Sequence, residues 1–267
     1  LGKTFPNRFN FFREKFSNLE KILKPDTNPK AIIFDLGLSS FQIDNAKRGF
    51  SFKKKGPLNM KMGINKFSAY EAINKLENNQ LIHILKILGE ERDAKKIVKK
   101  IDIYRKKNFI NFTDELSDII RSVKKNYKKF KIDPATKTFQ AIRIFVNQEL
   151  SELIFGLIAA TKLLKKGDIL IVVSFHSLED KIVKDFFNIH SNSKNPSRYL
   201  PIQNKKNKLF DIYSKKPMIP DKDELTKNIR SRSAKLRYAI RTSENFFYPE
   251  EFKKKYSHYL NLNEINL

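Results

Sequence analysis

Several side chains with hydrogen-bonding groups follow directly after a short apolar run near the start of the sequence. The run is AIIF at residues 31–34, and Asp35, Ser39, Ser40 and Gln42 come after it in a Gly- and Ser-containing turn. In open α/β sheets, ligands bind in the crevice at the carboxyl ends of the strands. An Asp at this place also commonly does no more than cap a turn. The two hydroxyls and the amide in the same loop favour a binding site.

A histidine follows a second apolar run. Residues 168–175 read DILIVVSF and predict a buried strand, and His176 stands directly after it. The carboxyl end of this strand is expected to open into the same crevice as Asp35. A single His after a strand is more often structural, and the spacing shows no third member for a Ser-His-Asp arrangement with Ser177. Nucleophilic hydrolysis is therefore not favoured, and Asp180 is expected to complete the cap of the next helix.

The helix expected after Pro134 carries a polar stripe opposite an apolar one. Its members lie at i, i+4, i+7, i+11 and i+15, and they are Thr136, Gln140, Arg143, Asn147 and Ser151. An exposed helix face in a chain with so many lysines is expected to carry Lys, whereas this face carries amides and hydroxyls with one Arg. We therefore favour a face that lines a site over an ordinary solvated face, with Asn147 and Arg143 as candidate residues.

Cations and aromatic rings alternate after the first candidate loop. Residues 48–57 read RGFSFKKKGP, and the candidate contacts to nucleic acid are Arg48, Phe50, Phe52, Lys53, Lys54 and Lys55. Rings can stack on bases while cations follow the phosphates of a single strand. A solvated lysine run with its phenylalanines docked on the core explains the pattern equally well. A second basic group, Arg230, Arg232 and Lys235, stands just before the last expected strand. Two interpretations are open for these cations: contact with phosphate, or protection of a strand edge.

Composition narrows the class of protein. The 267 residues include 54 Lys and Arg against 29 Asp and Glu, a net charge of +25, which indicates a polyanionic partner or a general drift towards Lys, Asn, Ile and Phe. The absence of Cys excludes disulfides and thiolate metal sites, and the four His residues show no ligand spacing, so no metal site is expected. The longest apolar stretch, residues 153–164, is too short to cross a bilayer, and no signal pattern is present, so we expect a cytoplasmic protein.

Periodicity and capping signals predict the elements that position these residues. Strands are expected at residues 9–12, 31–34, 168–175 and 236–242, and in the last of them Leu236, Tyr238 and Ile240 alternate with Arg237 and Arg241. Helices are expected near residues 16–24, over 69–76, 81–88, 90–107, 114–125 and 134–164, and after Ser177, with caps at Ser68, Asn79 and Thr113 and a stop at Gly89. This order predicts an α/β sheet interrupted by a helical insert.

The insert begins directly after the Asp35 loop, which is a suitable place for a substrate cover. We therefore divide the chain into residues 1–45 and 134–245 as two parts of the sheet domain, residues 46–133 as a helical insert with the basic loop, and residues 246–267 as a tail.

Seven segments, in this order, resemble the ribosomal RNA small subunit methyltransferase H family. They are DLGLSSFQID, RGFSF, GPLNMKM, GEERDAKKI, PATKTFQAIRIFVNQEL, SFHSLEDKIVK and SRSAKLR, and they extend over about residues 16–237. Members of this family use S-adenosylmethionine to methylate the exocyclic N4 of one cytidine in the decoding region of small-subunit ribosomal RNA. The resemblance implies a Rossmann-like methyltransferase sheet with the helical insert, and small-subunit ribosomal RNA or the small ribosomal subunit as partner.

The resemblance also implies roles for individual residues. Asp35, Gln42 and Phe16 stand at positions that contact the cofactor in the family. We hypothesise that Asp35 or its neighbouring backbone serves the cytidine amino group, while the pocket is shaped by Ser39, Ser40, Asn147 and His176.

Some residues depart from the family pattern. Asn59 replaces an Asp, Phe41 replaces a Pro, and Lys61 and Lys137 replace Arg, which weakens bidentate contacts. None of the 8 glycines forms the G-x-G cluster that holds the methionine end of the cofactor in the family. The expectation from these absences is an N-terminally truncated member whose first β–α units are missing. The alternative is a non-catalytic RNA-binding remnant, whereas a kinase-like enzyme lacks its P-loop.

Overall fold

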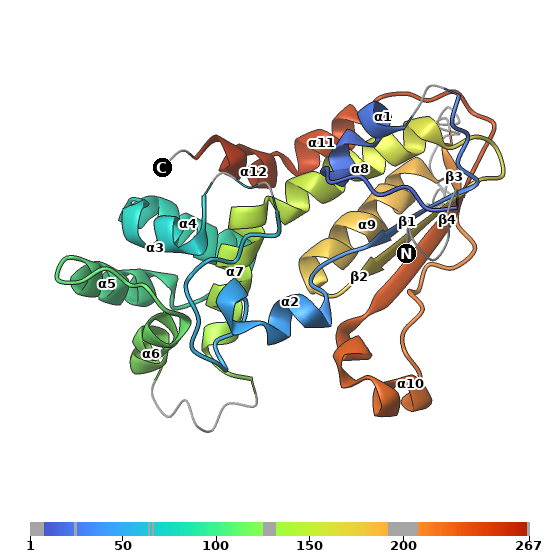
Figure 1. Cartoon of the computed structure of the whole chain (residues 1–267). Helices are drawn as coiled ribbons and strands as arrows, with labels where there is room; N and C mark the ends of the chain where they lie inside the picture. The colour runs from blue at the N-terminus through green and yellow to red at the C-terminus, as the bar shows by residue number, and fades with distance from the viewer. Residues whose placement is uncertain are drawn as a thin grey trace, which may run out of the picture. The chain divides into compact units, whose positions relative to one another are not determined.

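The computed structural model describes residues 8–23, 26–63, Asn65, 67–124, 132–191 and 208–265. Two compact units make up the chain (Figure 1). The first comprises Leu1–Leu36 and Glu152–Lys255, and the second comprises Gly37–Ser151 and Tyr256–Leu267.

The first unit contains a mixed four-stranded sheet with the order β1-β2-β4-β3 (Figure 1). Its strands are β1 (Ala31–Asp35), β2 (Ile169–Ser174), β3 (Phe210–Asp211) and β4 (Lys235–Arg241). Strands β1 and β2 are parallel, whereas β4 runs antiparallel to β2 and to β3. Parallel neighbours need a long crossover, and here residues 37–168 provide it. The predicted α/β class is confirmed.

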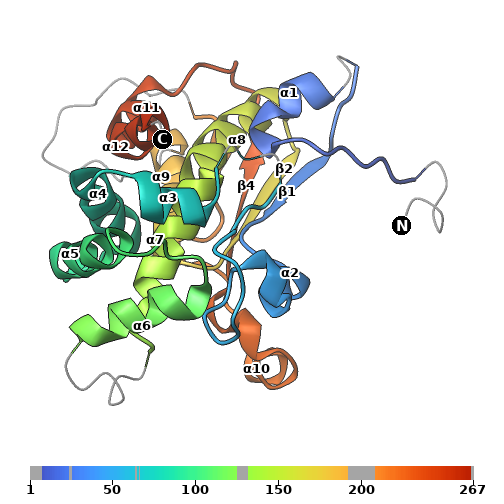
Figure 2. The same ribbon diagram turned by 60° about the vertical axis from the view of Figure 1, so that its left-hand side comes forward.

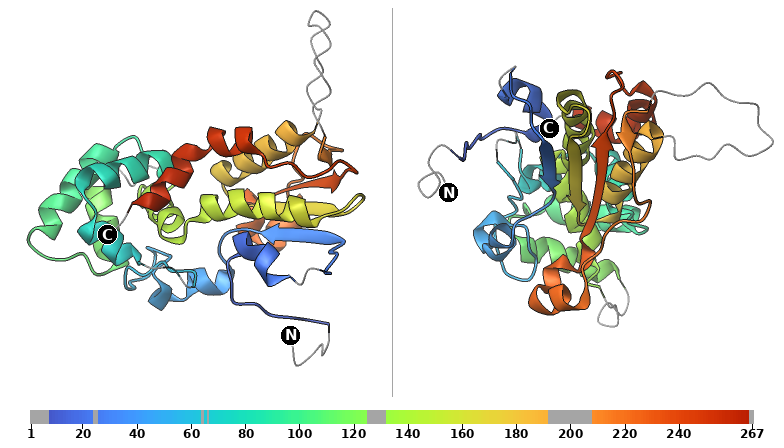
Figure 3. Two further views of the ribbon diagram at one scale, coloured as in Figure 1. Left: turned by 90° about the horizontal axis from the view of Figure 1, so that it is seen from above. Right: turned by 90° about the vertical axis from the view of Figure 1, so that its right-hand side faces the viewer.

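Helices α8 (Glu149–Leu163) and α9 (Ser177–His190) cover one face of this sheet, as can be followed in Figure 3. That face buries alternate strand residues: Ile32, Phe34, Leu170, Val172 and Ala239. Helix α9 buries a stripe at helical spacing that includes Leu178, Ile182 and Phe186. The first unit also contains η1 (Phe16–Asn18), α1 (Leu19–Ile22), α10 (Lys222–Lys227), η4 (Ile229–Ser233) and α11 (Glu250–Lys255).

The opposite face of the sheet is also apolar but keeps part of its surface exposed. Ile33 is 61% exposed, and Ile171, Val173 and Tyr238 on the same face are half-buried. The predicted alternation in β4 separates the two faces correctly. However, the arginine face is the packed one, because Asp180 and backbone carbonyls provide partners for the charged groups of Arg237 and Arg241.

The second unit is helical (Figure 2). Its elements are α2 (Ser40–Asp44), η2 (Ala46–Arg48), α3 (Ala69–Lys75), α4 (Asn78–Gly89), α5 (Ala94–Arg105), α6 (Thr113–Val123), α7 (Ala135–Asn147), α12 (Ser257–Leu260) and η5 (Asn261–Glu264). The helices predicted over 69–76, 81–88, 90–107 and 114–125 are present, although α5 begins four residues later than expected. The capping box of Ser68 and Glu71 at the start of α3 is confirmed. Their apolar faces form one core that contains Ile73, Leu85 and Ile142.

Three local predictions are wrong. Residues 9–12 form no strand, and Phe11 is 74% exposed, because no strand among the described residues pairs with this segment. The single helix expected over 134–164 is two helices, separated at Gln148, whose φ of 54° is left-handed. Helix α4 includes Gly89, and Glu90 (φ 48°) takes the left-handed position after it.

The helix caps also differ from prediction. Helix α4 begins after Glu77 rather than Asn79, and α6 begins after Phe112, so that Thr113 is its first residue. His176, not Ser177, occupies the N-cap of α9.

The division into compact units falls at other positions than the predicted domain boundaries. Helix α7 belongs to the helical unit, and the tail divides between Lys255 and Tyr256. Phe252 lies 4.9 Å from the Phe186 ring in the first unit, whereas Asn263 accepts a hydrogen bond from Ser151 in the second.

No single helix of the described residues is long and apolar enough to cross a membrane, and α7 and α8 reach that threshold only if taken as a bent pair.

Candidate functional site

Asp35 is the last residue of β1, paired with Val173 of β2. The strand pairing continues one residue further, because Leu36 N donates to Val173 O over 3.0 Å. The Asp35 side chain is exposed, and it makes no hydrogen bond or ion pair with any described residue. Its position at a strand end therefore leaves the carboxylate available as an acceptor for a ligand.

Phe16 lies in the apolar layer of the first unit. Its ring centroid is 5.0 Å from that of Phe34, and a Cβ at Gly156 would approach the Phe16 ring to 2.6 Å. The absence of a side chain at Gly156 therefore lets the ring pack directly against helix α8. A contact between Phe16 and the cofactor stays a prediction.

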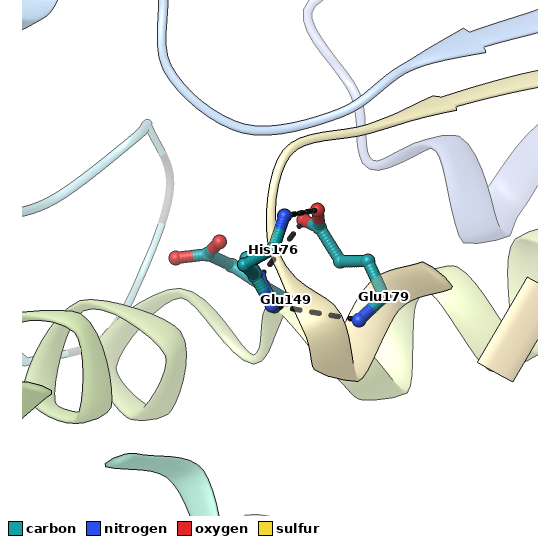
Figure 4. Close-up of side chains that lie close together, drawn as sticks. All are labelled: Glu149, His176 and Glu179. Atoms are coloured by element: carbon teal, nitrogen blue, oxygen red, sulfur yellow. Dashed lines mark hydrogen bonds and ion pairs between the residues drawn. The ribbon is translucent and has the colours of Figure 1, made fainter. Parts of the chain in front are cut away.

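His176 forms a reciprocal cap with Glu179 at the start of α9 (Figure 4). Its Nδ1 accepts from Glu179 N over 3.4 Å, and Glu179 Oε2 accepts from Phe175 N over 2.9 Å. The His176 Nε2 atom lies 3.1 Å from Glu179 Oε1 but lacks hydrogen-bond geometry. A structural role for this His is therefore visible in the structure, and its proposed part in the pocket stays a prediction.

The second unit begins with another capping box, which sequence reasoning missed. Ser39 Oγ accepts from Gln42 N, while Gln42 Oε1 accepts from Ser39 N over 3.0 Å. The signal was present, since Ser-x-x-Gln is a capping-box pattern. Ser39 and Gln42 are thus fixed by each other, and the Gln42 amide nitrogen remains available for a ligand, while Ser40 is exposed in the first turn of α2.

Asn147 ties the end of α7 to the loop at residues 60–65. Its Oδ1 accepts from Met62 N over 2.7 Å and from Asn65 Nδ2 over 2.6 Å. Its Nδ2 donates to Met60 O over 2.7 Å and to Arg143 O over 2.8 Å. The side chain is 4% exposed, and these bonds use both its donors and its acceptor oxygen. Asn147 therefore positions the loop.

Asn147→Ala is expected to lower the free energy of unfolding by about 2 kcal/mol, because buried groups of the loop lose their partners. Chemical denaturation followed by circular dichroism measures this change. Gln140→Ala is the matched control, since Gln140 stands on the same helix and its amide makes no hydrogen bond with described residues. Equal stability of the two variants would contradict the positioning role.

The basic loop divides into docked rings and exposed lysines. The Phe52 ring centroid lies 5.0 Å from that of Phe139, and Arg48 donates to Lys61 O over 2.7 Å with its guanidinium 5.7 Å from the Phe50 ring. The side chains exposed to solvent are Lys53, Lys54 and Lys55. The phenylalanine at position 52 is thus docked on a neighbouring ring, as in the structural interpretation of this segment. The exposed lysines remain available for contacts to phosphate.

The other predicted RNA contacts differ in availability. Arg143 donates from Nε and from one terminal nitrogen to the two carboxylate oxygens of Glu149, with both N–O distances at 2.8 Å. Arg230 and Arg232 are exposed. Lys235 donates to Asp180 Oδ2 over 2.9 Å. Their contacts to RNA stay predictions, and for Arg143 and Lys235 a neighbouring carboxylate already offsets the charge.

The prediction that Asp180 completes the cap of α9 is wrong, because His176 and Glu179 form the cap. Asp180 instead pairs with residues of β4. Arg237 Nε donates to its Oδ1 over 2.7 Å, beside the bond from Lys235. Burial alone raises the pKa of the Asp180 carboxyl, but the hydrogen bonds from Arg237 and Lys235 outweigh it, so that the pKa lies below its ordinary value. The pairing is tertiary, which explains why local sequence rules missed it.

Comparison with known proteins shows where this sequence belongs. The model of the MraW methylase family matches residues 2–242 of the 267 in the chain. The chain belongs to the MraW methylase family.

Curated relatives agree with this membership. A protein of Sinorhizobium fredii is 43% identical over 88% of this chain and 69% of its own length. One of Ehrlichia canis is 43% identical over 90% of this chain and 80% of its own, and one of Bartonella bacilliformis is 44% identical over 91% and 72%. All three are named Ribosomal RNA small subunit methyltransferase H, which confirms the resemblance seen in the motifs.

Two motif glycines of this MraW family chain hold the basic loop in shape. Gly56 donates from N to Thr113 Oγ1 over 3.1 Å and accepts at O from Thr113 N over 2.8 Å. Gly49 takes a left-handed φ of 69° after η2. Thr113, which was expected only to cap a helix, thus also anchors the loop at Gly56.

Proposed function

We propose that this MraW family chain uses S-adenosylmethionine to methylate the exocyclic N4 of a cytidine in the decoding region of bacterial small-subunit ribosomal RNA. The observation that carries the proposal is 41–44% identity, over about nine-tenths of the chain, to proteins named Ribosomal RNA small subunit methyltransferase H. We place the reaction in the cytoplasm, where this substrate is found.

The cytosine amino group is a poor nucleophile, because its lone pair is delocalised into the ring. An acceptor for its N–H bonds favours a pyramidal nitrogen and stabilises the positive charge that develops there. Asp35 supports this role, since its exposed carboxylate stands free at the end of a strand. Alignment of the amino nitrogen with the methyl donor supplies much of the remaining acceleration.

The described residues fit the cofactor in part. S-adenosylmethionine supplies an electrophilic methyl group on a sulfonium. The free Asp35 carboxylate and the Gln42 amide nitrogen suit its amino and hydroxyl groups. The 8 glycines of the chain form no G-x-G cluster for its carboxylate end. We therefore assign to Asp35 and Gln42 the binding of polar groups of the cofactor. Asp35 is also assigned the role of accepting hydrogen bonds from the amino group of the cytidine.

RNA as the substrate is consistent with the charge of the chain. The net charge is +25, and the side chains of Lys53, Lys54 and Lys55 are exposed. Within the described part of the chain these lysines make one ion pair, between Lys55 and Asp114 over 3.7 Å. An amino group that is paired in a duplex cannot reach a protein pocket, so the target cytidine must be unstacked or in a single-stranded region.

Transfer of a labelled methyl group from S-adenosylmethionine to small ribosomal subunits tests the proposal. We expect transfer by the wild type and a loss of about 100-fold in kcat/KM for Asp35→Asn, which keeps the shape but removes the charge. Asp223→Asn is the matched control, because Asp223 is an exposed carboxylate of the same unit. Nuclease digestion of the labelled RNA then identifies the methylated nucleoside.

The outcome also separates this proposal from its rival. Binding of ribosomal RNA without measurable binding of S-adenosylmethionine in calorimetry would favour the RNA-binding remnant. Transfer to a base other than cytidine would refute the N4 assignment. Ser39→Ala at full rate, with α2 intact, would remove Ser39 from the pocket.

A further inference from the structure

We propose that a groove in the second unit, lined by none of the residues assigned to methyl transfer, binds one unpaired nucleotide of the RNA substrate. This inference rests on the proposed function. The groove has a volume of about 450 Å³, within the range of about 300–1,000 Å³ that is usual for small-molecule sites. The residues that matter among its lining are Leu58, Asn59, Lys61, Tyr70, Asn111 and Phe112.

One wall of the groove is an aromatic ring on a fixed backbone. Phe112 N donates to Glu115 Oε2 over 3.0 Å, and Phe112 pairs with Pro57 in an isolated bridge. The Phe112 side chain is nevertheless 37% exposed, and Lys55 Nζ lies 4.4 Å from its ring centroid. A held, accessible ring with a cation beside it is suited to stacking of a base.

Three polar atoms of the lining have no partner among the described residues: Asn59 Nδ2, Asn111 Oδ1 and Tyr70 Oη. Both carboxamides are nevertheless held in place. Asn59 Oδ1 accepts from Lys61 N over 3.2 Å, and Asn111 Nδ2 donates to Phe109 O over 3.0 Å. The groove thus presents an oriented donor, an oriented acceptor and a hydroxyl, which is what recognition of the edge of an unstacked base requires.

The charges around the groove favour a polyanion. The lysines near it are Lys55, Lys61 and Lys75, and the carboxylates near it are Glu71, Asp114 and Glu115. Glu71 Oε2 accepts from Ser68 N over 2.8 Å, and mainly this bond lowers the pKa of the Glu71 carboxyl. Lys75 lies 3.8 Å from Glu71, and both Lys75 and Lys61 act on this carboxylate and offset part of its charge. Lys55 has no such role, so the phosphate is expected beside Lys55, with Lys61 adding to the positive potential. An acidic peptide would use the same lysines but would gain little from the Phe112 ring.

The test measures binding of a fluorescein-labelled single-stranded RNA decamer of mixed sequence to the full chain, by fluorescence anisotropy and without cofactor. We expect Phe112→Ala to weaken binding about 10-fold and Phe112→Tyr, which keeps the ring, to change it less than about 2-fold. Lys61→Ala is expected to weaken binding about 3-fold and to reduce the slope of log K against log salt by about 0.7.

Two control variants and one direct readout accompany these measurements. Tyr213→Ala removes a 70% exposed ring of the first unit, and Lys100→Ala removes an exposed lysine of α5, and both should bind the decamer as the wild type does. Circular dichroism verifies that each variant is folded. A decamer with 5-iodouridine should crosslink on irradiation to the peptide that carries Phe112 or Tyr70.

The results distinguish failure of the groove from failure of the proposed function. If the wild type transfers methyl groups to ribosomal subunits but Phe112→Ala and Lys61→Ala bind the decamer normally, the groove is no RNA site and the proposed function stands. If polyglutamate displaces the decamer and Phe112→Ala has no effect, the groove is a general anion site. If the wild type neither binds RNA nor transfers methyl groups, both inferences are wrong.

Discussion

Gly56→Ala is expected to lower the free energy of unfolding of the second unit by about 4 kcal/mol or more. Single substitutions rarely cost this much, and those that do include substitutions that create severe steric overlap. A Cβ at Gly56 would lie 1.9 Å from Ala46 O and 2.8 Å from Ala46 C, closer than any real contact. Both neighbours are backbone atoms, so no side-chain rotation relieves the clash. The loop must move, and the bonds between Gly56 and Thr113 break with it.

Denaturant unfolding of Gly56→Ala and the wild type measures this effect. Gly63→Ala is the matched control, because no atom lies within 4 Å of a Cβ at Gly63. The control is expected to stay within about 0.5 kcal/mol of the wild type, as surface substitutions do. Gly49→Ala should behave like Gly56→Ala, since its Cβ would meet Pro57 O at 2.0 Å and its φ is left-handed. A stable Gly56→Ala protein would show that the basic loop is packed differently.

Arg241→Met is expected to lower the free energy of unfolding of the first unit by about 3–4 kcal/mol. The Arg241 side chain is 5% exposed and donates to backbone carbonyls of Thr161, Leu209 and Glu244. Burial lowers the pKa of this guanidinium. Methionine keeps most of the aliphatic volume but leaves these carbonyls without their donor, at about 1–3 kcal/mol for each group that water cannot reach.

The conservative variant separates donation from charge. Arg241→Lys retains the charge but carries a point-like head with fewer fixed donors, so we expect it to recover less than half of the loss. Arg232→Met is the matched control, because Arg232 is an exposed arginine of the same unit and should change stability by less than about 0.5 kcal/mol. Equal losses for Arg241→Met and Arg232→Met would show that the carbonyl contacts contribute nothing.

Local signals predicted much of this fold. The runs AIIF and DILIVVSF correctly predicted two strands, and Ser68 with Glu71 correctly predicted the start of a helix. These predictions succeeded because each signal depends on residues only a few positions apart. Errors arose where a distant partner decides. Residues 9–12 have strand-like composition but no partner strand, and Gln148 breaks a helix whose apolar stripe continues on both sides of it.

The candidate site shows the same division. The sequence by itself determined the family, the position of Asp35 after a strand, and the cationic and aromatic composition of the loop from residue 48, because motifs and strand ends are local. The tertiary structure alone decided that Asn147 holds a loop, that Asp180 pairs with Lys235 and Arg237, and that Phe112 stands beside Lys55 in a groove. These are contacts between residues far apart in the chain, and their partners depend on three-dimensional packing, which no periodicity or capping rule encodes.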